Sequence, residues 1–202
     1  ESSNNSIYHN NFINNSNQAY SYNSINKWDY GYPSGGNYWS GYIETDSNND
    51  GIGQEEYVID AGNTDHYPLL GMFHRFITSI GNDVNVVSNS TVEDFQYFES
   101  NNTVRMIVSN MTANQTFGFI KICISHSLMS EIYPVTTDGG EPNYVNYNLY
   151  DNGTHRWIYF NYEHSKLEII IIPEFPSFLI LPLLMATLLA IAVWRRKYIT
   201  KS

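Results

Sequence analysis

The stretch from Asp46 to Tyr57, DSNNDGIGQEEY, concentrates oxygen-bearing side chains of the kind that bind a hard cation. In the EF-hand pattern D-x-[DN]-x-[DN]-G-x5-E, positions 1, 3 and 5 supply oxygen ligands, a glycine turns the chain, and an acid closes the site at position 12. Asp46, Asn48, Asp50 and Gly51 fill the first four requirements, whereas Tyr57 stands at position 12. The front half of the loop is therefore suited to calcium, but the closing ligand is missing or comes from elsewhere.

The acids nearest to position 12 are Glu55, Glu56 and Asp60. Calcium is the candidate cofactor, and the alternative is a Gly-Asn-Asp turn whose side chains bond the backbone. No flanking helices are indicated, so the pattern does not favour a regulatory EF-hand. The predicted metal ligands are Asp46, Asn48, Asp50, Glu55 and Glu56.

Other residues with catalytic chemistry show no productive spacing. The six histidines form no HExxH motif, and the neighbours Glu55 and Glu56 are a poor glycosidase pair, because such acids face each other across a substrate. The single cysteine, Cys123, lies in an apolar alternation that predicts a buried structural thiol. No catalytic residue is predicted.

Composition and charge limit the class of protein. The first 50 residues contain 12 Asn, and the chain contains 17 Tyr, which favours turns and strands over helices. Residues 1–172 carry a formal charge of −13, and residues 173–202 carry +3. A polyanionic body does not suit nucleic acid, since phosphate binding depends on clustered Lys and Arg. An all-β protein with no nucleic-acid partner is the expectation.

Residues 71–172 alternate in hydropathy with a period of two. Three runs show this most clearly, at 104–108, 120–124 and 158–162, and turn signals such as Asp151-Asn-Gly153 separate the runs. About seven short strands at this spacing predict an Ig-like β-sandwich.

The first seventy residues are rich in Asn and aromatic residues. The run NSIYHNNFINN at 5–15 resembles a rung of the right-handed parallel β-helix of the NosD-like periplasmic copper-binding family, and GGNYWSGY, DSNNDGIG, YVID and DHYPLL resemble the segment that closes such helices in archaeal surface proteins. The resemblance implies stacked strands with Asn ladders, capped through Trp28 and Trp39, over residues 1–70. A sugar-stacking aromatic platform in residues 26–42 is the alternative to capping. The NosD resemblance also raises copper, for which Met72, His74, Met106 and Met111 are candidates, although scattered surface His and core Met are the better account of these residues.

The C-terminal end is apolar and then basic. Residues 177–194 carry no charge and would span about 27 Å as a helix, which predicts a transmembrane helix rather than a buried core helix. The basic tail after it predicts a cytoplasmic C-terminus and an extracellular N-terminal part. Pro173-Glu-Phe-Pro176 with the apolar span and the Arg-rich end resembles the PEF-type anchor of archaeal surface proteins, over residues 173–202.

Together these observations predict a single-pass cell-membrane protein of three parts, with the β-sandwich at residues 71–172. Since no export signal begins the chain, a fragment of a longer protein is expected. The expected function is a non-catalytic stalk or adhesion role that supports an upstream β-helix, with membrane lipid and surface polysaccharide as partners. The alternative is the end of a β-helix polysaccharide lyase or hydrolase, or of a NosD-like copper-related protein. Sequons that would suit a glycoprotein stand at Asn4, Asn14, Asn89, Asn101, Asn110, Asn114 and Asn152.

Overall fold

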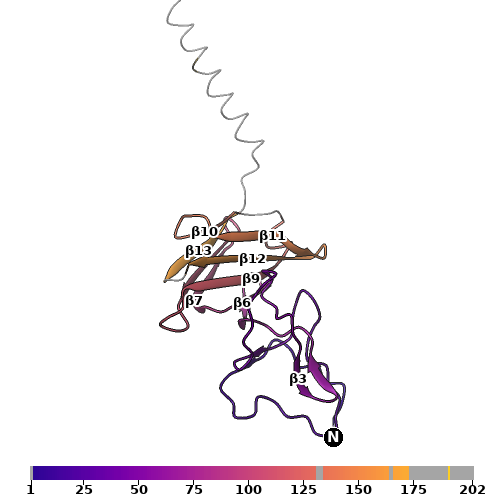
Figure 1. Cartoon of the computed structure of the whole chain (residues 1–202). Coiled ribbons are helices and arrows are strands. Elements are labelled where there is room, and N and C mark those ends of the chain that lie inside the picture. Colours follow the sequence, from indigo (N-terminus) through magenta and orange to yellow (C-terminus); the bar gives the residue numbers. More distant parts are fainter. Residues whose placement is uncertain (1, 131–133, 164–165, 173–190, 192–202) are drawn as a thin grey trace, which may run out of the picture.

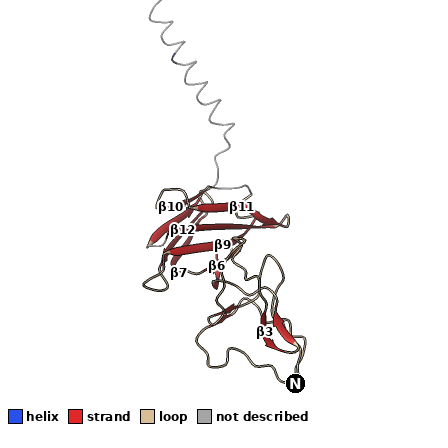
Figure 2. Cartoon of the chain, viewed as in Figure 1, coloured by secondary structure: helices blue, strands red, loops and turns tan. Residues whose placement is uncertain are grey.

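The computed structural model describes residues 2–130, 134–163, 166–172 and 191, and these form an all-β protein (Figure 1). Thirteen strands and no α-helical element occur in this part of the chain (Figure 2). The predicted fold class, all-β plus one transmembrane helix, is therefore corrected to all-β, because the described residues follow the period-two alternation that favours strands. Within them, no helix has the length and apolar character needed to cross a bilayer. The predicted span, 177–194, falls outside the described residues except for Ile191.

Residues 71–172 form two antiparallel sheets. The five-stranded sheet has the order β11-β12-β9-β6-β5, and the four-stranded sheet has the order β10-β13-β8-β7. The bounds in the five-stranded sheet are β5 Met72–Ile77, β6 Asp83–Ser88, β9 Phe117–Ser125, β11 Tyr144–Asp151 and β12 His155–Glu163. Those in the four-stranded sheet are β7 Thr91–Phe98, β8 Thr103–Ser109, β10 Val135–Thr137 and β13 Leu167–Ile171.

An apolar core lies between these two sheets, and we call the pair the sandwich. Alternate residues of β8 point into it, so that Val104, Met106 and Val108 are fully buried. The same alternation in β9 and β12 brings in side chains from the other sheet, and burial of this kind stabilises by roughly 25 cal/mol per Å² of apolar surface. The core residues from β9 and β12 are Ile120, Ile122, Ile124, Ile158, Phe160 and Tyr162.

The five-stranded sheet is also covered on its other face. Eight of the nine residues of β9 are buried, in contrast to the half-buried pattern expected of a sheet with one solvated face. The covering layer comes from the first seventy residues: Ile52 and Leu69 pack with Val87, Phe119 and Tyr159 in a second apolar cluster. Residues 2–70, here called the N-terminal unit, thus share a core with the sandwich. Figure 1 shows this unit against the sandwich, and we call the boundary between them the joint.

The N-terminal unit stacks three chain segments in parallel. Strand β1 (Asn11–Phe12) pairs in parallel with β2 (Tyr38–Trp39), and isolated parallel bridges join Ser6 to Lys27 and Tyr38 to Leu69. The last segment includes an antiparallel hairpin of β3 (Tyr57–Asp60) and β4 (Asn63–Asp65). Strands this short bring little stability by themselves, so side chains must hold the stack together.

Candidate functional site at the joint

The first residue of the acidic loop (residues 46–57), Asp46, accepts hydrogen bonds from the backbone of the same loop. Its Oδ1 accepts a 3.0 Å hydrogen bond from the Asp50 amide, and its Oδ2 accepts a 3.0 Å bond from the Gly51 amide. Gly51 has φ +71°, and a Cβ there would lie 3.0 Å from the Phe119 ring. Both the turn and the close approach of β9 therefore require glycine at this position.

The carboxylate of Asp50 also accepts hydrogen bonds from within the loop. Its Oδ1 accepts a 2.8 Å bond from the Ile52 amide, and its Oδ2 accepts a 2.8 Å bond from Nδ2 of Asn48. The Asp50 residue is only 3% exposed, and burial raises its carboxyl pKa against the lowering effect of the Ile52 amide and the Lys121 charge. These contacts match the turn interpretation of the sequence, in which the side chains bond the backbone.

Of the two predicted ligands at the end of the loop, Glu56 has another side-chain partner, and Glu55 is bonded through its backbone. Glu56 Oε1 is 2.6 Å from Nδ1 of His66, and the amide of Glu55 donates a 3.3 Å bond to Glu44. Glu44 also accepts a bond from the Tyr42 hydroxyl. Among the described residues, no three His, Cys, Asp or Glu side chains gather in a way that could hold a metal ion. Calcium takes six to eight oxygens, whereas the carboxylate oxygens of Asp46 and Asp50 accept hydrogen bonds from within the loop.

A buried lysine faces the acidic loop from the sandwich. Lys121, in the middle of β9, is 2% exposed, and its Nζ donates a 3.0 Å hydrogen bond to the carbonyl oxygen of Pro33 in the N-terminal unit. Burial lowers the pKa of Lys121 to about 8, and the charges of Asp50 and Asp46 oppose that shift. The Lys121 ammonium group and the carboxylates of Asp50 and Asp46 therefore interact electrostatically across the boundary between the N-terminal unit and the sandwich.

Tyr159 adds to the same environment from the neighbouring strand β12. Its side chain is fully buried, and burial together with the Asp46 carboxylate raises the pKa of its phenol. The acidic loop thus lies against Lys121 and Tyr159, two polar side chains of the face that the N-terminal unit covers. Period-two patterning had placed both residues on the strands, but it could not show that this outer face is buried.

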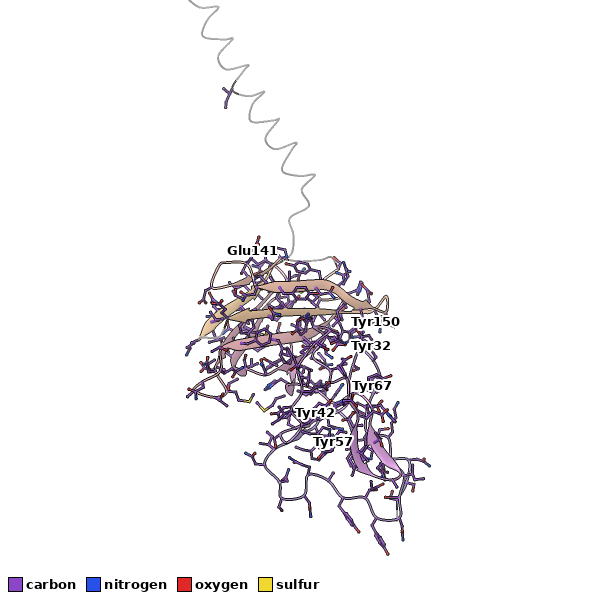
Figure 3. The ribbon with its side chains drawn as sticks, viewed as in Figure 1. Tyr32, Tyr42, Tyr57, Tyr67, Glu141 and Tyr150 are labelled. Atoms are coloured by element: carbon purple, nitrogen blue, oxygen red, sulfur yellow. The ribbon has the colours of Figure 1, made fainter. Side chains whose placement is uncertain are left out.

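Further contacts at the joint come from the start of the chain. The side-chain amide of Asn11 donates a 2.9 Å bond to the Phe73 carbonyl and accepts a 2.7 Å bond from the Phe73 amide, on the edge strand β5. His9 stacks on the Phe73 ring at 4.0 Å. Tyr32 meets Tyr150 of β11 edge-on at 6.3 Å, and Figure 3 shows these two labelled side chains beside each other. The joint is thus polar and aromatic around its apolar centre.

One ladder of polar side chains runs through the stacked segments to Asp65. Oδ1 of Asn37 accepts bonds from the amide (3.1 Å) and the side chain (2.9 Å) of Asn10. The amide of Asn37 in turn donates a 2.7 Å bond to Oδ2 of Asp65, and Nε1 of Trp39 donates a 2.9 Å bond to the same oxygen. Asp65 is fully buried, and burial raises the pKa of its carboxyl against the lowering effect of these donors.

A second ladder runs parallel to the first. Oδ1 of Asn26 accepts bonds from the amide (3.1 Å) and the side chain (2.8 Å) of Asn5, and the amide of Asn26 donates a 2.9 Å bond to Oδ1 of Asn63. Trp28 donates its indole hydrogen to the same Asn63 oxygen at 2.9 Å. The two ladders satisfy buried polar groups that strands of two residues leave unpaired.

The predicted tryptophans lie inside the N-terminal unit. Trp39 is fully buried and stacks between Phe12 and Tyr57, with ring centroids 4.2 Å apart on each side. Trp28 is 4% exposed and packs against Trp39 at 6.0 Å. Figure 3 shows Tyr57 next to Tyr42 in this unit. Since both tryptophans are covered, neither presents a flat ring to a ligand.

The remaining candidates have structural surroundings. Cys123 is buried, and burial raises the pKa of its thiol to about 12, which suppresses the reactive thiolate. Met106 lies in the apolar core of the sandwich, and the ring of His74 stacks on Phe76 at 6.0 Å. These two copper candidates therefore have packing roles in the described structure.

Comparisons with known proteins add no relative: no family model, no curated protein and no solved structure matches the chain.

Proposed function

We propose that this chain is a non-catalytic cell-surface protein with a stalk or adhesion role, in which the sandwich carries the N-terminal unit as one rigid body. The observation that supports this is the shared core, in which Ile52 and Leu69 pack against the outer face of β9, β6 and β12. The Lys121 bond to Pro33 adds a polar contact across the same joint. A stalk must hold its two ends in a fixed arrangement. A buried apolar joint limits the relative motion of the two units and so meets this requirement.

The surface location and the membrane attachment rest on sequence features. The acidic charge of residues 1–172, the exposed Asn114 and Asn152 within sequons, and the resemblance to the C-terminal parts of archaeal surface proteins favour an exterior location. Attachment to membrane lipid is assigned to residues 173–202, and surface polysaccharide is the proposed partner. No observation on the described residues favours the alternative of a lyase, a hydrolase or a copper-related protein.

Calorimetry of the full chain tests the rigid joint. One unfolding transition, with equal calorimetric and van't Hoff enthalpies, is the expected result, since the two units share a core. Ile52→Asp should separate the transition into two or lower its midpoint sharply, because Ile52 is 3% exposed. The matched control is Ile43→Asp, since Ile43 is 93% exposed and the change should leave the transition in place. Two independent transitions in the unmodified chain would refute the proposal.

A further inference from the structure

Two exposed tyrosines form a pair on the N-terminal unit. Tyr20 is 80% exposed and Tyr22 is 63% exposed, and their rings lie 6.4 Å apart at an interplanar angle of 21°. Covering aromatic faces that are this exposed to water with a ligand is energetically favourable. The pair is thus a surface available for stacking, in contrast to the buried Trp28 and Trp39.

A groove begins beside this pair. A hollow of about 570 Å³ is lined by Tyr22, Ile25 and Asp60 among others, and a second of about 490 Å³ continues from it. The two hollows share Ile25, Ala61 and Gly62, so they form one groove between the 21–29 segment and the β3–β4 hairpin. Ile25 is 65% exposed and gives this groove an apolar floor. A groove of this kind at the surface suits an extended chain better than a compact small molecule.

Fixed polar groups line the same groove. Oδ1 of Asp60 accepts 2.8 Å bonds from the amide of Gly62 and from Nδ2 of Asn63, which orient the carboxylate and lower its pKa. The hydroxyls of Ser21 and Ser24 lie 2.8 Å apart at the groove's first hollow. Carboxylate and hydroxyl groups of fixed direction are the partners that sugar hydroxyls need, while the tyrosine faces suit the C–H face of a sugar ring.

We propose that the groove from Tyr22 along Ile25 to Asp60 binds a neutral polysaccharide chain, with the Tyr20–Tyr22 pair stacking on its sugar rings. This inference rests on the proposed surface function and names the partner of that role. Neutral rather than anionic glycans follow from the charge of −13 on residues 1–172, which repels polyanions. The residues that line the groove belong to the N-terminal unit. Figure 1 shows this unit away from the last described strand, β13. A partner on the far side of a stalk could therefore reach it.

Isothermal titration of the full chain with maltohexaose, cellohexaose and chitohexaose, one at a time, tests the proposal. We expect binding of at least one of them with a Kd on the order of 1 mM, as for a shallow stacking site. Tyr22→Ala and Tyr20→Ala should each weaken that binding about tenfold, and Tyr22→Phe should keep it within about twofold. The matched control is Tyr144→Ala, since Tyr144 is 42% exposed on β11 of the sandwich and should not matter.

The results distinguish failure of the groove proposal from failure of the proposed stalk function. Failure of all three hexasaccharides to bind the folded wild-type chain overturns the groove proposal, as does unchanged binding by both alanine variants. Either result leaves the rigid joint standing if calorimetry still shows one transition. Two transitions together with tyrosine-dependent sugar binding would instead refute the stalk and retain the groove.

Discussion

Nζ of Lys121 donates a 3.0 Å hydrogen bond to the carbonyl oxygen of Pro33, and this bond connects the middle of β9 to the N-terminal unit across a buried joint. Asp50 and Asp46 supply the negative charges that favour the ammonium form. A buried lysine is tolerated only when such partners compensate its desolvation. The acidic loop and the lysine are therefore best understood as one charge system that belongs to the joint.

Lys121→Met should destabilise the protein, because it leaves Asp50 buried beside no cation. We expect a loss of about 3 kcal/mol in the free energy of unfolding, measured by urea denaturation of the full chain. The control is Lys166→Met, whose contact with Glu93 lies at the surface, so that its loss should cost much less stability. Equal losses in the two variants would contradict the assigned role of Lys121.

The pH dependence of stability should also depend on Lys121. Its folded pKa of about 8 lies below the ordinary value of 10.5, so between these values the unfolded chain binds more protons than the folded chain. Stability contributed by this group therefore rises with pH through that window, by at most about 1.4 kcal/mol per pH unit. The groups facing the ammonium are Asp46, Asp50, Cys123 and His9.

Subtraction isolates the contribution of Lys121 from those of the other titratable groups. The difference in unfolding free energy between wild type and Lys121→Met, measured from pH 7 to pH 10, should increase with pH. A difference that stays flat or falls would show that Lys121 keeps an ordinary pKa in the folded protein.

Asp65→Asn should destabilise the N-terminal unit although it preserves shape. Oδ2 of Asp65 accepts from Asn37 and Trp39, and Oδ1 accepts a 3.1 Å bond from the Tyr67 amide, so an amide nitrogen at either place would face a donor. The expected cost is about 1–3 kcal/mol by chemical denaturation. Asp83→Asn, which removes only an exposed contact to Arg75, is the control and should cost much less stability than Asp65→Asn.

Gly36→Ala tests the close approach of the chain to the same carboxylate. A Cβ at Gly36 would lie 1.9 Å from Oδ1 of Asp65, which is buried and held on both oxygens, so the overlap forces the stack apart. We expect a loss of about 2 kcal/mol or more in unfolding free energy. Gly41→Ala meets nothing within 4 Å and should be neutral. A neutral Gly36→Ala would mean that the second and third segments are packed less closely than described.

The strands of the sandwich could be predicted because their physics is local. Alternation at 104–108 and 158–162 marks the residues that face the inter-sheet core, and the Asp151-Asn-Gly153 turn signal falls where Gly153 adopts φ +82°. The full burial of β9 could not be predicted in this way. It depends on Ile52 and Leu69, which lie at least fifty residues away in sequence from Phe119.

In the candidate site, too, local features could be predicted from the sequence, whereas the long-range contacts could not. The local bonding of Asp46 and Asp50 followed from their turn chemistry, which the sequence left open beside calcium. Lys121 was the missed partner, and its signal was a lone lysine within the apolar run Phe119-Ile-Lys-Ile-Cys123. A charge in such a run indicates that an opposite charge from another segment must meet it. Only the folded arrangement shows that this segment is the acidic loop.

Calcium should leave the stability of the protein unchanged, because the acids of the loop bond backbone amides and Glu56 contacts His66. Thermal melting of the full chain with millimolar calcium, compared with equal magnesium, should give the same midpoint for both ions. A calcium-specific rise of more than about 3 °C would contradict this expectation, since binding at ten times the Kd adds about 1.4 kcal/mol. In that case Asp46→Asn should abolish the rise and so place the ion in the loop, whereas a rise that persists in this variant would place it elsewhere.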